Sequence, residues 1–220
     1  MGRCLPVIGI LVILGPFGSV SRAEALPFAV FGEGWDGPGR GRADLTFYFG
    51  TPTLDFPRDL QHAALITALD AWASVAALTF TETFLADQPR SIDFNFETSV
   101  QTDFLAFAFF PEGGGDVFFN DNFPWEFGNV LGSAAFDMER VAVHEIGHAL
   151  GLDHSTTQNA VMWPFTSPND VFVRLHPDDV AGINSLYASV TVPEPSTLLL
   201  ASVGLFALAL TCRGRLLRRT

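Results

Sequence analysis

The sequence of 220 residues predicts an α+β domain at residues 44–190, with an added segment at each end. Short runs with an apolar residue at every second position indicate strands. Two longer segments have the apolar pattern and end signals of helices, and a third helix begins at a proline. A hydrophobic content of 48% is ample for one core.

The first 25 residues have the pattern of a secretory signal peptide. Arg3 precedes an apolar run from Leu5 to about Val20, and residues 23–25 have the small-x-small form of a cleavage site. A buried N-terminal helix is the alternative, but the run contains two prolines and shows no helical period. Residues 26–43 are Gly-rich and lack apolar periodicity, which predicts a flexible lead-in.

The domain itself begins with a strand followed by a long helix. Residues 43–50 alternate Leu45, Phe47 and Phe49 toward one side, which is the period of a strand. Pro57 then stands near a helix start. The next residues predict an amphipathic helix of about five turns, with one apolar stripe formed by Leu65, Leu69, Trp72 and Ala76.

Four further strands and two further helices follow. Turn or Gly-rich segments separate the strands, which are predicted at residues 78–84, 91–97, 104–110 and 116–120. The frequent phenylalanines of these strands are most simply core residues. A second helix runs from an N-cap at Asp137 to Leu150 and stops at Gly151, and the final helix starts at Pro177.

The predicted secreted part is strongly acidic. Of the 24 acidic residues only Glu24 and Glu194 lie in the two ends, whereas six of the 12 arginines lie there. The remaining 22 acidic residues against six arginines argue against binding of nucleic acid. Cys4 and Cys212 also lie in the ends, so a transition-metal site must use histidine and carboxylate ligands.

Residues 141–155 carry three of the five histidines. His144 and His148 are four residues apart, so they project from one helix face and can bind one metal ion. Gly151 permits a sharp turn that returns His154 as a third ligand. Three imidazoles leave a fourth position for water on zinc, and Glu145 is placed to act as general base. The other two histidines, His62 and His176, are interpreted as surface or capping residues.

The last thirty residues form a separate unit. Pro193-Glu194-Pro195 precedes about seventeen apolar or small residues, close to the minimum for a membrane span, and four arginines follow. These arginines place the C-terminal end in the cytoplasm. The order of motif, span and arginines resembles the PEP-CTERM sorting signal of Gram-negative bacteria. This resemblance implies export to the cell envelope and processing by an exosortase-type enzyme.

Residues 44–187 resemble the catalytic domain of a matrixin, the matrix metalloproteinase family within the metzincins. The similarity rests on HEIGHALGLDHS, on VMWPF with Met162 as the floor of the metal site, and on LAFAFFPEGGGDVFFND and DDVAGINSLY. It implies a twisted mixed sheet of five strands with one antiparallel edge strand. That edge, which includes Leu105 and Ala106, would pair with an extended substrate. The specificity pocket would be walled by Trp163, Pro164, Phe165 and Thr166.

The sequence departs from the matrixin pattern at a second metal site. Matrixins usually hold a structural zinc ion through three histidines and an aspartate, but two of those histidine positions are Phe107 and Phe118. One catalytic zinc ion is therefore expected, with aromatic packing in place of the other. A calcium ion at Asp116 is an alternative to a plain Gly-rich turn there.

The predicted function is that of an exported, monomeric zinc endopeptidase that acts on protein or peptide substrates. The alternative is a non-catalytic envelope or matrix module that keeps zinc for stability. Glu145 favours the peptidase, because a purely structural zinc site has no use for a carboxylate beside an open position.

Overall fold

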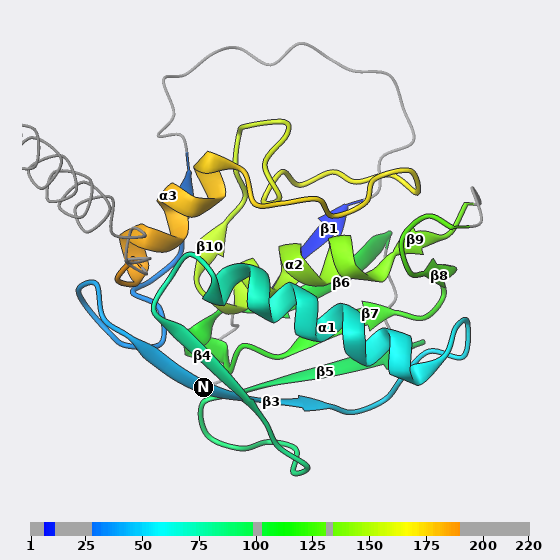
Figure 1. Cartoon of the computed structure of the whole chain (residues 1–220), viewed down its shortest axis with the longest axis horizontal. Coiled ribbons are helices and arrows are strands. Elements are labelled where there is room, and N and C mark those ends of the chain that lie inside the picture. Colours follow the sequence, from blue (N-terminus) through cyan, green and yellow to red (C-terminus); the bar gives the residue numbers. More distant parts are fainter. Residues whose placement is uncertain (1–6, 12–27, 99–102, 131–133, 190–220) are drawn as a thin grey trace, which may run out of the picture. The chain divides into compact units, whose positions relative to one another are not determined.

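The computed structural model describes residues 7–11, 28–98, 103–130 and 134–189 (Figure 1). Its main sheet has the strand order β1-β6-β7-β5-β3-β4. Strands β4, β3, β5 and β7 are parallel, whereas β6 and β1 are antiparallel to their neighbours. The bounds of the six strands are β1 (Val7–Leu11), β3 (Ala43–Phe49), β4 (Leu78–Glu82), β5 (Ser91–Glu97), β6 (Phe104–Phe109) and β7 (Val117–Asn120).

The five predicted strands are all present, and the mixed sheet with antiparallel β6 confirms the predicted fold class. The edge differs from the expectation, because β1 pairs with β6 from Val7↔Phe109 to Leu11↔Phe104. Strand β1 lies within the segment predicted to be the signal peptide. In this structure β1 therefore covers the edge of β6, which would be free in the predicted sheet of five strands. An added strand pairs with an exposed sheet edge in the same way.

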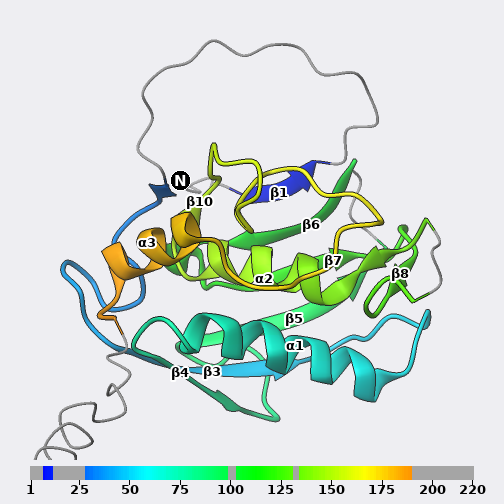
Figure 2. The same cartoon turned by 45° about the horizontal axis from the view of Figure 1, so that its top comes forward.

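Helices α1 (Arg58–Ala73) and α2 (Met138–Ala149) lie side by side on one face of the sheet (Figures 1 and 2). Leu65, Leu69 and Trp72 of the predicted stripe are buried on α1, but the helix ends earlier than predicted, so Ala76 is buried beyond its end. Trp72 donates Nε1–H to the carbonyl of Val143 in α2 at 2.9 Å. The predicted N-cap of α2 is confirmed, since the Asp137 side chain accepts from the backbone N–H of Glu139. This contact between helices fixes α2, the element that carries the histidine pair.

Helix α3 (Pro177–Leu186) begins at the predicted proline. Its N-cap is His176, whose Nδ1 accepts from the Asp178 N–H at 3.1 Å, and Asp179 completes a capping box. His62 lies on the surface, where its Nε2 is 3.0 Å from Glu82 Oε1. The interpretation of both histidines as surface or capping residues is confirmed.

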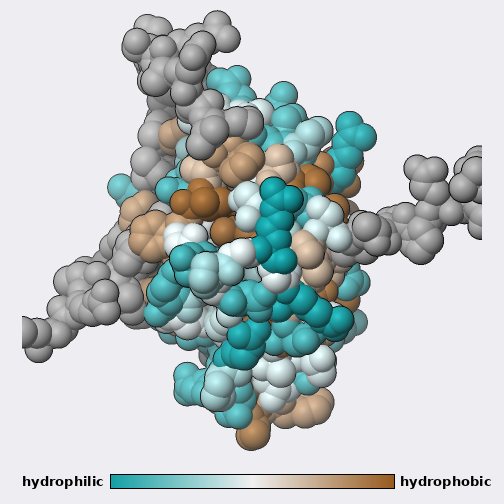
Figure 3. All heavy atoms as spheres, turned by 90° about the vertical axis from the view of Figure 1, so that its left-hand side faces the viewer, coloured by the Kyte–Doolittle hydropathy of each residue, from teal (hydrophilic) through white to brown (hydrophobic). Residues whose placement is uncertain are grey.

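Aromatic side chains fill much of the core, as the sequence predicts. Phe96 stacks on Phe119 with ring centroids 4.8 Å apart, and Trp125 of β8 (Trp125–Glu126) meets both rings edge-on. Strand β8 pairs with β9 (Phe136–Asp137) just before α2. Phe107 and Phe118, which the resemblance places at two expected histidine positions, also stack, with ring centroids 5.0 Å apart. The face shown in Figure 3 is largely hydrophilic, with smaller groups of apolar residues.

The lead-in differs from the prediction of a flexible segment without elements. Within its described part, β2 (Ala29–Val30) pairs with β10 (Leu152–Asp153). Trp35 donates Nε1–H to Ala149 O at 2.8 Å and its backbone N–H to the Tyr187 hydroxyl at 3.0 Å. Phe31 stacks on Phe110 with ring centroids 4.2 Å apart. These partners are distant in sequence, so no local periodicity in residues 26–43 indicates them.

The predicted C-terminal membrane span and sorting segment, residues 191–220, lie outside the described residues, as does most of the predicted signal peptide. Among the helices that the structure does describe, none is long and apolar enough to cross a membrane. The predicted domain boundaries at these ends stay predictions.

Replacement of Trp35 by Phe tests whether the lead-in stabilises the domain. The change removes the donor to Ala149 O at the C-terminal end of α2. We expect the free energy of unfolding to fall by about 1–3 kcal/mol, since a buried acceptor loses its partner. Denaturant unfolding of the full chain measures it. Phe84→Leu is the control, because Phe84 is 87% exposed and should change little. Equal stability of Trp35→Phe and wild type would contradict a stabilising role of this contact.

Candidate metal centre

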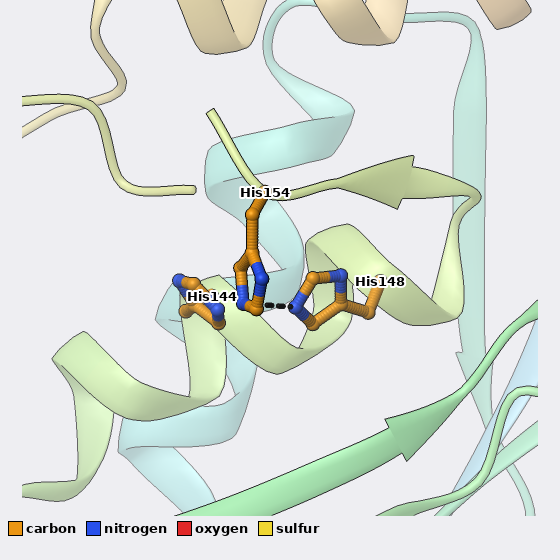
Figure 4. A group of neighbouring side chains, drawn as sticks. All are labelled: His144, His148 and His154. Carbon is orange, nitrogen blue, oxygen red and sulfur yellow. Dashed lines mark hydrogen bonds between the residues drawn. The ribbon is translucent and has the colours of Figure 1, made fainter. Parts of the chain in front are cut away.

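Three histidines converge from two elements (Figure 4). His144 and His148 project from neighbouring turns of α2, and His154 follows β10. Between them Gly151 adopts a φ of 105°, a left-handed conformation that a residue with a Cβ atom rarely takes. One potential ligand nitrogen from each ring lies within 4.8 Å of the other two. The predicted return of His154 toward the other two histidines by a sharp glycine turn is thus the observed geometry.

Backbone carbonyls orient two of the rings. His144 Nδ1 lies 2.6 Å from Val161 O, and His148 Nδ1 lies 2.7 Å from Leu152 O. A carbonyl oxygen only accepts hydrogen bonds, so each Nδ1 carries the proton. Each Nε2 therefore presents a lone pair toward the shared centre, which is the tautomer that a metal ligand needs.

The protonation states of the histidines also suit metal binding. Burial first, and then the charges of neighbouring histidines, lower the pKa of His144 well below its ordinary value and that of His148 to about 3. Burial lowers the pKa of His154 as well. All three rings are therefore neutral near pH 7 and need lose no proton to bind a cation.

The spacing of one pair of nitrogens fits a tetrahedral zinc ion, and all three nitrogens lie within 4.8 Å of one another. His148 Nε2 and His154 Nε2 are 3.2 Å apart. Two ligands at the zinc–nitrogen distance of about 2.0–2.1 Å in tetrahedral geometry stand about 3.3 Å from each other. His144 Nε2 is buried and has no hydrogen-bond partner among the described residues. A buried imidazole nitrogen without a partner is costly unless it binds a ligand, so the residues present fit a zinc ion.

Glu145 follows the first histidine on α2 and is fully buried. Neither of its carboxylate oxygens has a hydrogen-bond partner within the described part of the chain. Burial raises the pKa of Glu145 well above its ordinary value, while the charge of Arg140 acts in the opposite direction. A carboxyl group held in this way is suited to accepting and returning a proton near neutral pH.

The turn that contains Met162 is fixed by α3. The Asp179 carboxylate accepts from the backbone N–H groups of Val161 and Met162 at 2.8 and 3.0 Å. Val161 in turn supplies the carbonyl that orients His144. No pattern in the sequence predicted Asp179 as part of the site. The sequence Pro-Asp-Asp, which contains Asp179, indicated only the start of the final helix.

Met162, predicted as the floor of the site, packs against the histidine helix near Gly147. It is 2% exposed. A Cβ atom built on Gly147, between the two helical ligands, would stand only 2.3 Å from Met162 Sδ and 3.1 Å from Trp72 Cζ2. Glycine at this position therefore lets the helix, the turn and α1 approach closely.

The residues predicted to wall a specificity pocket lie at a cavity of about 850 Å³. Trp163, Phe165 and Thr166 line it, and Trp163 and Phe165 meet edge-on with centroids 5.4 Å apart. Pro164 joins them in sequence but is not among the lining residues. The lining also includes Arg140, which the sequence analysis did not single out.

Leu105 and Ala106 are fully buried on β6, so only their backbone groups are suited to binding an extended chain. One side of β6 pairs with β7, through Ala106↔Phe119, and the other pairs with β1. In the intact chain β1 thus occupies the edge predicted for substrate. Removal of the predicted signal peptide would remove β1 with it.

The predicted calcium ion at Asp116 finds no support. Asp116 Oδ1 accepts from the backbone N–H of Asp93 at 3.1 Å. The described residues contain one group of three metal-ligating side chains, and this group is formed by the histidines. Residues 112–116 therefore form a Gly-rich turn in which the aspartate accepts a hydrogen bond.

Two family profiles match the chain. The Matrixin profile matches residues 39–188, and the PEP-CTERM protein-sorting motif matches residues 191–215. Both similarities noted in the sequence are therefore confirmed.

Curated relatives are matrix metalloproteinases. Stromelysin-2 of Rattus norvegicus is 34% identical over 163 residues, which cover 66% of this chain and 33% of that protein. Matrix metalloproteinase-19 of Mus musculus is 38% identical over 156 residues, which cover 66% and 28%. Stromelysin-1 of Rattus norvegicus is 34% identical over 192 residues, which cover 75% and 39%. The chain thus spans about a third of the length of these relatives.

Replacement of Gly147 by Ala tests the close packing under the histidine helix. The added Cβ would clash with Met162 Sδ. We expect the free energy of unfolding to fall by about 1–3 kcal/mol, as overpacking typically does. In a Met162→Ala background the same change should cost less, because the clashing side chain is gone. Equal costs in both backgrounds, measured by denaturant unfolding, would show that the two residues do not interact.

A pH titration of stability tests the burial of Asp116. Burial raises its pKa to about 6, from an ordinary value of about 4. The folded state then holds a proton that the unfolded state has lost, so the free energy of unfolding should fall as pH rises from about 4 to 6. Asp116→Asn keeps an acceptor for Asp93 and should reduce this fall. Parallel curves for variant and wild type would contradict the raised pKa, and stabilisation of wild type alone by calcium would support the calcium site.

Proposed function

The chain belongs to the matrixin family, and from that premise we propose that it is an exported zinc endopeptidase acting on protein or peptide substrates. The observation that carries the proposal is the combination of three convergent imidazoles with an adjoining buried carboxylate. His144, His148 and His154 would hold one zinc ion per chain. Zinc in such a site lowers the pKa of bound water to about 7 and polarises a carbonyl oxygen.

Glu145 performs the proton transfers in this proposal. Its carboxylate takes a proton from the attacking water as the new carbon–oxygen bond forms at the substrate carbonyl. The proton then passes to the amine nitrogen as the carbon–nitrogen bond breaks. The carboxylate has no hydrogen-bond partner among the described residues that would compete for this role.

The same residues argue against the alternative of a non-catalytic zinc-stabilised module. A non-catalytic module would need only the three histidines and the two carbonyls that fix the tautomers of His144 and His148. A fully buried Glu145 without a partner adds a desolvation cost to such a module and brings no benefit to stability. A peptidase, in contrast, uses this group in every turnover.

Substrate and cellular location follow from the family match and from the ends of the chain. The PEP-CTERM motif supports export to the cell envelope of a Gram-negative bacterium and processing by an exosortase-type enzyme. Once residues 1–25 are removed, the β6 edge at Leu105 and Ala106 offers backbone groups to an extended peptide. Residues 163–166 then form a wall beside it. A single chain contains all the groups that this reaction requires, so we propose a monomer.

Replacement of Glu145 by Gln separates the peptidase from the non-catalytic module. The amide keeps the size of the side chain but accepts no proton. We expect peptidase turnover to fall by about a hundredfold to ten-thousandfold, the typical contribution of general-base catalysis. Zinc content and melting temperature should stay near the wild-type values. Peptide cleavage assays on the exported form, with zinc measured by atomic absorption, check both.

His148→Ala is the matched control, because it removes a ligand from the same helix. This variant should lose zinc, stability and activity together. Full activity of Glu145→Gln would contradict the proton-transfer role of Glu145 while leaving a peptidase in place. A zinc-loaded wild type that cleaves no protein or peptide between about pH 6 and 9 would overturn the proposed function.

A further inference from the structure

Three consecutive buried residues at the end of the histidine helix have carbonyl groups that accept hydrogen bonds from distant parts of the chain. The carbonyls at a helix C-terminus have no partner within the helix, and a buried carbonyl without a partner is costly. The acceptors are Ala149 O, Leu150 O and Gly151 O, and their donors, each 2.8 Å away, are Trp35 Nε1–H, the Tyr187 hydroxyl and Phe31 N–H, respectively.

The turn that these donors hold positions two of the three histidines. It reverses the chain at Gly151, where φ is 105°. Leu152 O follows directly and accepts from His148 Nδ1 at 2.7 Å. His154 comes two residues later and completes the group of three rings. A shift of the turn would therefore move both the acceptor that orients His148 and the third ring itself.

Tyr187, the residue after α3, couples these donors to one another. Its side chain is fully buried. The hydroxyl donates to Leu150 O at 2.8 Å and accepts from the backbone N–H of Trp35 at 3.0 Å. Burial raises the pKa of Tyr187 above its ordinary value, so the hydroxyl keeps the proton that it donates. Loss of this one hydroxyl would remove the partner of two groups at the turn.

Helix α3 holds Tyr187 close to the turn. The helix lies beside β10 (Figures 1 and 2). A Cβ atom built on Gly151 would stand 3.0 Å from Leu186 Cδ1, and one built on Gly182 would stand 3.0 Å from Leu152 Cδ2. The hydroxyl therefore reaches the turn from an element that is closely packed against it.

We propose that Tyr187 is a positioning residue of the zinc site, because its hydroxyl holds the Gly151 turn in the conformation from which His154 reaches the metal ion. The same turn supplies the carbonyl that orients His148. The inference rests on the proposed zinc peptidase and specifies a distant group that determines how tightly its site binds zinc. A loose turn would have to be ordered when zinc binds, which costs conformational entropy, whereas a turn held beforehand avoids this cost.

Tyr187→Phe tests the proposal in the full chain, because it removes only the hydroxyl. The dissociation constant of zinc is measured by competition with a chromophoric chelator, at a temperature at which all variants are folded. We expect it to rise about tenfold, the lower end of the range for groups that orient metal ligands, because Tyr187 acts through the backbone. Cobalt in place of zinc gives a visible spectrum that depends on the coordination geometry, and this spectrum should change as well.

Two variants serve as matched controls. Tyr48→Phe removes the hydroxyl of the other tyrosine, which lines a cavity beside His62, and should keep the wild-type zinc affinity. Trp125→Phe removes a buried indole donor to Asn120 O and should lower the melting temperature. Its zinc affinity and cobalt spectrum should still equal those of the wild type, because its ring contacts are with β5, β7 and β9 and not with the Gly151 turn.

Two results would overturn the role of Tyr187. The first is a Tyr187→Phe variant with a lower melting temperature but wild-type zinc affinity, since the hydroxyl would then be purely structural. The second is an equal loss of zinc affinity in Trp125→Phe, since affinity would then follow overall stability. If Tyr187→Phe does not fold, Trp35→Phe decides by the same measurements, because it removes the neighbouring donor to Ala149 O.

Peptide cleavage by the wild type separates this inference from the proposed function. A wild type that binds zinc but cleaves no peptide or protein would overturn the proposed peptidase, and the zinc measurements would still decide the role of Tyr187. A wild type that binds no zinc would overturn both.

Discussion

Three imidazole nitrogens must meet within 4.8 Å although two come from a helix and the third from the residue after the short strand β10. Helical spacing brings two of them together, because residues four apart share one face. The third depends on Gly151, where a φ of 105° reverses the chain within a few residues. Each helical ring also needs a carbonyl acceptor for its Nδ1–H, so the segments that supply Val161 O and Leu152 O must be held in place.

This requirement explains why both ends of the described domain pack around the histidines. Asp179, at the start of α3, binds the backbone of the turn that supplies Val161 O. Strand β2 pairs with β10, which supplies Leu152 O, and Trp35 binds Ala149 O at the end of α2. Tyr187 joins the two ends, since its hydroxyl accepts from Trp35 N–H and donates to Leu150 O. Segments far apart in sequence thus fix the three histidines.

Local patterns predicted most of the fold and the convergence of the three histidines, and contacts between distant segments account for what was missed. The five strands and three helices follow from periodicity, caps and the glycine stop at Gly151, all of which are readable within a few residues. Strand β2 and the contacts of Trp35 were missed because their partners lie more than a hundred residues away.

X-ray absorption at the zinc edge of the exported protein tests the central claim most directly. The claim is that one zinc ion is held by three neutral imidazoles with one position left for water. The predicted spectrum shows three imidazole nitrogens at about 2.0–2.1 Å and one further oxygen ligand. Four protein ligands on the zinc ion would contradict the claim, because no position would then be left for a water molecule beside Glu145. Fewer than three imidazoles would also contradict it, because His144, His148 and His154 could not then all be ligands.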